Sequence, residues 1–313
     1  LAVQESAGII DVSTLGKLLV RGPDAGEFLD RMYPNVMLSI QPGRIRYGVT
    51  TSEADLAARI LEHAPDIQML QEVWNPANCD EDGRPAEANA APYVCSLPGV
   101  SQAARLLPDG YAWSCSRDYP DDCIAFRTDV FVPEPPAGGG PACDGADCTA
   151  AMESLVALCG QAGRISYLPG TGASGATVFV VVHTNAGPDA SDKACRGQQI
   201  SALQEVLVAL PPATALFVAG DFNFDPVEHA GADVDAYKAL LAATGLARLP
   251  DDGPTHRILG QDLDLVLVRG WEAAATAACH VQVTDPDREV PMFDHVYVSC
   301  RQAAKASVPD ERW

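Results

Sequence analysis

Apolar positions along most of this chain occur either as short runs of strand length or at helical spacing. The helical spacing predicts helices over residues 55–63 and 198–209, and Pro65 ends the first of them. The short runs predict strands over residues 67–73, 124–131, 176–183, 215–220, 262–268 and 295–300. Apolar strands that alternate with helices are typical of an α/β fold in which helices cover two stacked sheets.

Two stretches interrupt this pattern. Residues 79–96 are rich in Asp and Ala, and residues 133–148 are rich in Pro and Gly. Both predict long loops, which in compact domains are commonly functional or mobile. We therefore expect these two loops to influence which substrate or partner the protein accepts.

The first 53 residues follow a different pattern, which predicts a strand, an amphipathic helix over residues 24–33 and a second strand after Pro42-Gly43. The stretches GIIDVSTLGK, VRGPDA and PGRIRYG are similar to the aminomethyltransferase (T-protein) domain, and most similar to its homologue in sarcosine oxidase alpha chains. A piece this short cannot bury a core of its own or close a folate pocket. We expect residues 1–53 to be a fused fragment, and residues 54–313 to form the independent domain.

Polar side chains stand at the ends of five apolar runs: LQEV at 70–73, VHTN at 182–185, AGDFN at 219–223, LDLVLV at 263–268 and FDH at 293–295. A carboxylate at a strand end suits a hard cation such as Mg²⁺, which takes one or two protein oxygens and several waters. An imidazole there can protonate a leaving alkoxide. Each segment alone has a simpler explanation, such as an Asx turn for Gly-Asp-x-Asn. The argument therefore depends on all five together.

In this order the five segments resemble the endonuclease/exonuclease/phosphatase superfamily, which includes DNase I-like nucleases, abasic-site endonucleases, neutral sphingomyelinases and inositol polyphosphate phosphatases. The resemblance extends over about residues 54–300. It implies a DNase I-like, four-layer α/β sandwich with two mixed β-sheets between helices. It also implies a metal-dependent phosphoester hydrolase.

The resemblance assigns the metal to three oxygen-bearing side chains. Glu72 corresponds to the principal ligand, and Asp294 lies beside the metal. The expected ion is Mg²⁺, with Mn²⁺ and Ca²⁺ as alternatives. The family also has an Asn at the end of its first strand, for which Asn35 is the only candidate. Asn35 lies in the stretch that resembles the aminomethyltransferase, so the sequence leaves its assignment open.

The same resemblance assigns the groups around the phosphate. His183 donates to a phosphate oxygen or protonates the leaving alkoxide, and Asn223 holds a phosphate oxygen and the Asp221 carboxylate. Asp221 orients or deprotonates the attacking water. The implied mechanism is an in-line attack of water on phosphorus.

A second histidine is implied as the alternative base. His295 would accept the proton of the water, and Asp264 would orient His295, since a histidine base needs its other ring nitrogen fixed by an acceptor. Asp262 is the less favoured partner because it lies outside the Asp-Leu-Val-Leu pattern. The chain departs from the family at Phe293, where a Ser usually precedes Asp-His.

Charge and cysteine content modify this picture. The net charge of −21, with 21 basic against 42 acidic residues, disfavours tight binding of nucleic acid. Bound cations invert the local potential, however, so the charge does not exclude a nuclease. Ten cysteines without a CxxC pair indicate disulfides in an exported protein, secreted or periplasmic, with buried free thiols as the alternative. Cys143 and Cys148 bracket a tight loop and could bond locally.

The sequence thus predicts an exported, Mg²⁺-dependent phosphodiester hydrolase that is nuclease-like. Its substrate would be a nucleic acid, a nucleotide or a phospholipid headgroup, and stable membrane insertion is not expected. A sphingomyelinase-like lipid phosphodiesterase is one alternative, favoured by the acidic charge and by Asn35-Val36-Met37-Leu38. A non-catalytic binding protein with a degenerate site is another. A folate-dependent methyltransferase is disfavoured because most of that domain is missing. The sequence determines neither the substrate nor the oligomeric state.

Overall fold

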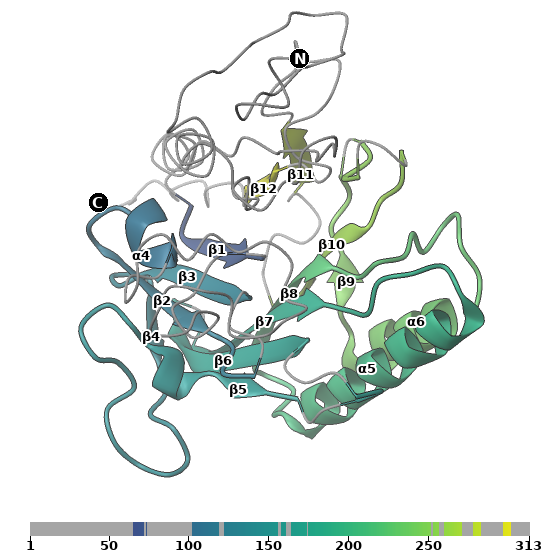
Figure 1. Ribbon diagram of the computed structural model, residues 1–313. Coiled ribbons are helices and arrows are strands. Elements are labelled where there is room, and N and C mark those ends of the chain that lie inside the picture. Colours follow the sequence, from purple (N-terminus) through teal and green to yellow (C-terminus); the bar gives the residue numbers. More distant parts are fainter. Residues whose placement is uncertain are drawn as a thin grey trace, which may run out of the picture. The chain divides into compact units, whose positions relative to one another are not determined.

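The structure is a computed structural model (Figure 1) that describes residues 65–71, 73, 102–118, 122–155, 158–160, 164–173, 175–251, 253–256, 260–270, 278–282 and 297–301. The chain divides into two compact units, Leu1–Pro65 with Glu72–Asp109, and Asp66–Gln71 with Gly110–Trp313. In the described part of the first unit there is one short helix, α4 (Gln102–Leu106). All further elements described below belong to the second unit.

The second unit contains two larger sheets and a two-stranded one. The first sheet has three antiparallel strands in the order β1-β3-β2, which are β1 (Ile67–Leu70), β3 (Cys123–Arg127) and β2 (Tyr111–Cys115). The two-stranded sheet pairs β11 (Ala278–Gln282) with β12 (Tyr297–Arg301).

The largest sheet has seven strands in the order β4-β6-β7-β8-β10-β9, with β5 also paired to β6. Its strands are β4 (Phe131–Pro133), β5 (Glu153–Ser154), β6 (Ile165–Gly172), β7 (Gly175–His183), β8 (Ala215–Asp221), β9 (Ala247–Arg248) and β10 (Asp264–Arg269). Only β7 and β8 pair in parallel among the paired strands of this sheet that the structure describes. The connection between them is the helix α5 (Ala190–Ala209), as a parallel crossover requires.

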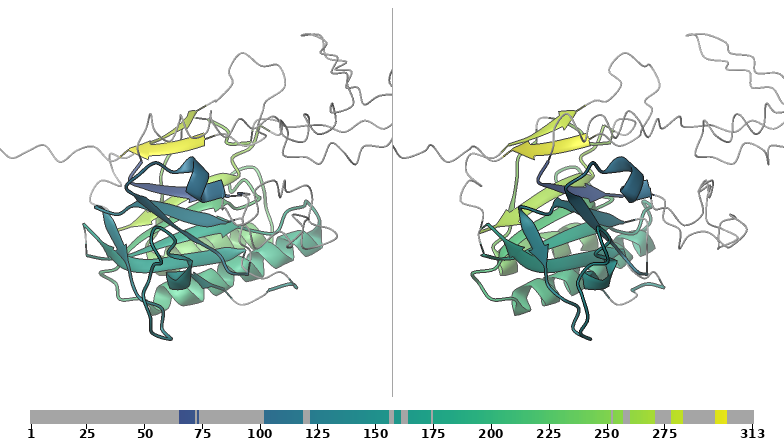
Figure 2. Two further views of the ribbon diagram at one scale, coloured as in Figure 1. Left: turned by 60° about the vertical axis from the view of Figure 1, so that its left-hand side comes forward. Right: turned by 90° about the vertical axis from the view of Figure 1, so that its left-hand side faces the viewer.

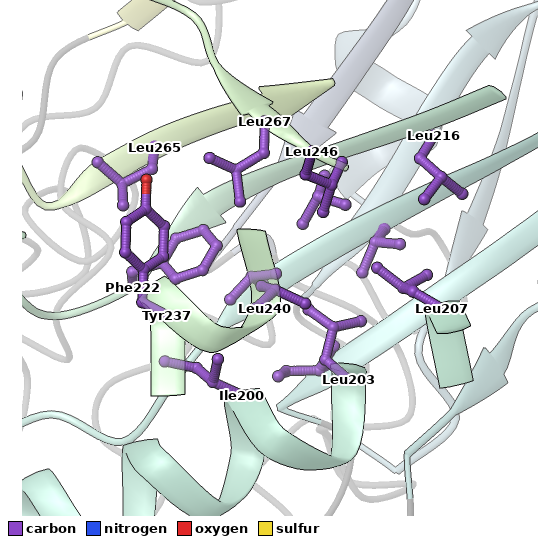
Figure 3. Close-up of a cluster of buried hydrophobic side chains, with 14 of the residues drawn as sticks. Ile200, Leu203, Leu207, Leu216, Phe222, Tyr237, Leu240, Leu246, Leu265 and Leu267 are labelled. Atoms are coloured by element: carbon purple, nitrogen blue, oxygen red, sulfur yellow. The ribbon is translucent and has the colours of Figure 1, made fainter. Parts of the chain in front are cut away.

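Each face of the seven-stranded sheet is covered. Helices α5 and α6 (Ala232–Thr244) lie side by side against one face (Figure 1, Figure 2). Leucine and isoleucine side chains of α5 point at β8 and β10 there, together with Tyr237 and Leu240 of α6 (Figure 3). Against the other face pack the side chains of the three-stranded sheet, through an edge-to-face series of rings from Phe126 to Phe131 and Phe179. The fold is therefore an α/β sandwich with two stacked sheets, as the sequence predicts.

The central strand shows why the sequence folds in this way. From Thr177 to His183 every residue of β7 is buried, because both faces of the sheet are covered. Such a strand reads as a continuous apolar run instead of an alternating one. Among the helices that the structure describes, none has the length and apolar character needed to cross a bilayer.

Most predicted strands are present with shifted ends, one strand prediction is wrong, and one predicted helix is longer than expected. The strand predicted over residues 124–131 is broken by a turn at residues 128–130, so that β3 and β4 belong to different sheets. The helix predicted over residues 198–209 begins at Ala190. The long loop predicted over residues 133–148 is confirmed from residue 134 onward, because residues 134–148 form no helix or strand. The predicted helix over residues 55–63, the loop over residues 79–96 and residues 1–53 lie outside the described residues.

Candidate active site

Three of the predicted catalytic residues are neighbours across three strands. In the parallel pair β7–β8, His183 is the register partner of Asp221. In the antiparallel pair β8–β10, Asp221 is the register partner of Asp264. His183 and Asp221 are the last residues of β7 and β8, and Asp264 is the first residue of β10. The three therefore form one row across the ends of neighbouring strands. We call His183, Asp221 and Asp264 the strand-end row.

Asn223 is fixed to this row by the turn that follows β8. Its backbone N–H donates to Asp221 Oδ1 over 2.6 Å, and its Nδ2 donates to Asp221 Oδ2 over 3.0 Å. The same Nδ2 also donates to the carbonyl of Thr184, over 3.0 Å. Asn223 has a φ of +54°, a conformation that Asn tolerates better than most residues. Both carboxylate oxygens of Asp221 are thus held in place before any substrate binds.

Gln71 joins the ends of β7 and β8. Its Nε2 donates to the carbonyl of Val182 over 2.5 Å, and its Oε1 accepts the backbone N–H of Asp221 over 3.2 Å. Gly220, the residue opposite Val182, has a φ of +139° and provides the space for this carboxamide. These two hydrogen bonds place Gln71, the residue before Glu72 in the chain, at the strand-end row.

Gly220→Ala is expected to destabilise the protein by about 1–3 kcal/mol, because its Cβ would overlap the Val182 carbonyl oxygen in a strained backbone conformation. Urea unfolding of this variant and of Gly253→Ala measures the difference. Gly253 is the matched control, since a Cβ there meets nothing within 4 Å. Equal midpoints for the two variants would contradict the role given to Gly220.

His183 is held by a carboxylate that the sequence analysis missed. The ring Nδ1 lies 3.2 Å from Asp122 Oδ1, and both side chains are buried. Because an ionised carboxylate only accepts hydrogen bonds, Nδ1–H is the donor. Asp122 therefore fixes the orientation and the tautomer of the ring through Nδ1.

The charges around His183 favour its protonated form. Burial lowers the pKa of the imidazole, but the hydrogen bond to Asp122 and the negative charges of Asp122 and Asp221 raise it more. The positive charge of Arg164 opposes them. The net result is a pKa above the ordinary value for histidine, so His183 keeps its proton to a higher pH and can act as an acid.

The segment after His183 is anchored by a buried ion pair. Arg196 of α5 donates to Asp233 Oδ2 from Nη2 over 2.7 Å and from Nε over 2.9 Å, and both side chains are almost fully buried. The third nitrogen of the guanidinium, Nη1, donates to the carbonyls of Asn185 and Gly187. Asn185 itself bonds to Asp192 near the start of α5. Its side chain thus ties the segment to the helix.

Asp264 is positioned by its backbone. Its N–H and that of Leu263 both donate to Thr255 Oγ1, a buried hydroxyl, over 2.8 Å and 3.0 Å. Asp262 forms an ion pair with Arg248 on the neighbouring strand β9. This pairing supports the preference for Asp264 over Asp262 as the site residue.

The proposed metal ligands Glu72, Asp294 and Asn35, and the base His295, lie outside the described residues. Within the described part of the chain, no three His, Cys, Asp or Glu side chains are grouped to hold a metal. The proposed ligands all offer oxygen atoms, which are the donors that hard divalent cations prefer. Gln71, which precedes Glu72 in the chain, is bonded to the backbone at the strand-end row. The chemistry of the proposed donors therefore suits a divalent cation.

Disulfides are present as the cysteine content predicts. The structure pairs Cys115 with Cys123, Cys143 with Cys148, and Cys159 with Cys195. The local bond predicted between Cys143 and Cys148 is thus confirmed.

Comparison with curated proteins reveals relatives of the N-terminal segment. The alpha subunit of sarcosine oxidase from Corynebacterium sp. (strain U-96) is 54% identical over 48 residues, which is 15% of this chain and 5% of that subunit. The aminomethyltransferase of Thermotoga sp. (strain RQ2) is 29% identical over 112 residues, 34% of this chain and 30% of that enzyme. The chain therefore spans less than a third of the curated relatives it matches here.

Solved structures share the fold of most of the chain. An endonuclease/exonuclease/phosphatase family protein from Leptotrichia buccalis C-1013-b has a TM-score of 0.51 at 17% identity, covering 80% of this chain and 93% of that one. TDP2 from D. rerio, complexed with single strand DNA product, has a TM-score of 0.50 at 14% identity, covering 80% and 92%.

Two family models match the chain. The GCVT N-terminal domain matches residues 1–58, which agrees with the resemblance of this stretch to the aminomethyltransferase. The model of the endonuclease/exonuclease/phosphatase family matches residues 45–299, which include every residue of the strand-end row. Membership of this family indicates a phosphoric ester hydrolase. The chain belongs to the endonuclease/exonuclease/phosphatase family.

Proposed function

We propose that this protein is a metal-dependent phosphodiester hydrolase in which water attacks phosphorus in line with the leaving alkoxide. The observation that carries the proposal is the strand-end row, which sets an imidazole and two carboxylates at adjacent register positions. Such a row offers an acid and a base at the ends of neighbouring strands. Hydrolysis of a phosphodiester requires both groups close together.

His183 is the proposed acid. Asp122 holds its Nδ1–H, and Nε2, the other ring nitrogen, would give its proton to the leaving alkoxide or donate to a phosphate oxygen. The raised pKa keeps this proton on the ring at neutral pH more than in a free histidine. We therefore expect the rate to fall as the pH rises through the pKa of His183.

Asp221 or His295 is the proposed base. The Asp221 carboxylate is bonded to both donors of Asn223 and lies beside His183 in the strand-end row. Asn223 would bind a phosphate oxygen and keep the carboxylate directed at the water. Asp264 would orient His295, as in the sequence prediction.

Glu72 and Asp294, with Asn35 as a further candidate, would hold the divalent cation, for which we propose Mg²⁺. When bound, the cation supplies Lewis acidity and neutralises charge on the phosphate. The chain has 42 acidic residues and only 21 basic ones, so it would repel an anionic substrate. A bound cation would reverse the electrostatic potential at the site. The three disulfides support an exported protein, secreted or periplasmic.

Hydrolysis of bis(p-nitrophenyl) phosphate by oxidatively folded protein tests the proposal. We expect turnover with Mg²⁺, its loss in EDTA, and its recovery when Mg²⁺ is restored. His295→Ala should lower the rate by about 10²–10⁴-fold if His295 is the base. Asp235→Asn, at an exposed position on α6, is the control. Turnover that survives EDTA would contradict the metal requirement, and no turnover from folded protein would favour a binding protein.

A further inference from the structure

The disulfide between Cys115 and Cys123 lies directly beside the carboxylate that holds His183. The two cysteines are register partners at the end of the β2–β3 pair, and both are buried. Asp122 is the residue before Cys123, and its carbonyl accepts the backbone N–H of Ser116 over 2.9 Å. The covalent bond therefore closes the base of the segment that carries Asp122.

Hydrogen bonds fix the same segment from the side of β2. Cys115 N–H donates to Thr149 Oγ1 over 3.1 Å, and the Ser116 hydroxyl bonds to that of Ser154 over 3.1 Å. Ser154 in turn bonds to the buried hydroxyl of Ser166 on β6. The disulfide links Cys115, which these hydrogen bonds hold in place, to Cys123 on β3, the residue after Asp122.

Asp122 needs such an anchor because its side chain is completely buried. A buried carboxylate costs free energy unless it is paired, and it would move to water if its segment were free to do so. The pair with His183 has one described distance, 3.2 Å, between Oδ1 and Nδ1. A small displacement of the segment would therefore weaken the pair.

We propose that the Cys115–Cys123 disulfide is a positioning element for His183, because it holds the Asp122 carboxylate against the Nδ1 atom of the imidazole. The inference rests on the proposed role of His183 as the acid, but its test does not require turnover. Neither cysteine touches the reacting atoms in this account. Both act through Asp122.

The charged groups that face His183 define the expected direction. Among the residues that the structure describes, they are Asp122, which precedes β3, Asp221 on β8, and Arg164, which precedes β6. Removing the disulfide leaves Asp221 and Arg164 unchanged. A loosened Asp122 would then stabilise the imidazolium less, so the pKa of His183 would fall.

The experiment is an NMR titration of the His183 ring in the full-length, oxidatively folded protein, with the signal assigned by its loss in His183→Gln. In the variant C115A/C123A, the pKa of His183 should fall by at least half of the drop that Asp122→Asn causes. Adding C115A/C123A to Asp122→Asn should change the pKa little further. C143A/C148A is the matched control, because that disulfide closes a loop without a site residue, and it should leave the titration unchanged.

Each result decides the question. A His183 titration in C115A/C123A that matches the unmodified protein would overturn the proposal. If C115A/C123A does not fold, the volume-conserving variant C115V/C123A is titrated instead. Loss of fold in both would also overturn it, since the disulfide would then maintain the fold as a whole.

Enzyme kinetics provide a separate readout. In C115A/C123A the high-pH limb of kcat/KM should move to lower pH, as in Asp122→Asn. A lowered pKa of His183 without turnover in any variant would support the positioning role and reject the proposed function. Turnover with an unmoved limb and an unmoved titration would reject the positioning role alone.

Discussion

Asp221→Asn is expected to lower kcat/KM for a phosphodiester by about 10²–10⁴-fold, the usual contribution of general-base catalysis. An amide at this position accepts no proton from the attacking water. It would also set an NH₂ group against Asn223 Nδ2, which now donates to Asp221 Oδ2 over 3.0 Å. Steady-state rates with saturating Mg²⁺ measure the loss, and circular dichroism checks that the fold is kept.

Asp235→Asn is the matched control for this prediction. It makes the same change of a carboxylate to an amide in the first turn of α6. Its kcat/KM should remain within about threefold of the unmodified protein, because Asp235 is exposed, is not one of the proposed site residues, and such surface substitutions rarely disturb the fold. If Asp221→Asn were equally active, His295 would be left as the sole candidate base.

Asp233→Leu is expected to destabilise the protein by about 3–5 kcal/mol, because it leaves the Arg196 guanidinium buried without its counter-ion. Removal of one partner from a buried pair costs more than removal of both. The double variant R196M/D233L should therefore recover part of the loss. Urea unfolding of the two variants and the unmodified protein measures these differences.

The two variants also separate stability from function. Arg196 donates to the carbonyls of Asn185 and Gly187, just after His183. R196M/D233L should therefore show reduced activity even at temperatures where it is fully folded. A cost below about 1 kcal/mol for Asp233→Leu would show that the pair contributes no more than an exposed ion pair.

The strands that carry the site could be predicted because their patterns are strong. The run that ends at Asp221 contains no polar residue before it, and the run that ends at His183 contains only Thr177. Their register in the sheet could not be predicted from these patterns alone. The family resemblance assigned His183, Asp221, Asn223 and Asp264 to one site, and in the structure they lie at neighbouring positions.

The first half of α5 could not be predicted for a physical reason. Its buried face there carries Arg196 and Gln199, which read as exposed positions in a sequence. Arg196 is buried only because Asp233, 37 residues later, pairs with it. The sequence analysis also missed α6, although that helix ends at Gly245 in a left-handed conformation, which is a stop signal present in the sequence.

Asp122 had no signal in the sequence. It directly precedes the strand β3, a position where an acidic residue is most simply read as solvent-exposed. Its partner His183 is 61 residues away. Gln71 is similar, since its bonds to Val182 and Asp221 span 111 and 150 residues. Long-range pairs of this kind require the fold before they can be recognised.

The strand-end row owes its order to backbone pairing in the sheet. Loops near such a row can lengthen, shorten or change composition while the acid and the carboxylates stay where they are. The chemistry and the choice of substrate can therefore change independently of each other in the course of evolution. Strand ends of this kind can hold the same side chains in place while the surrounding loops acquire new specificities.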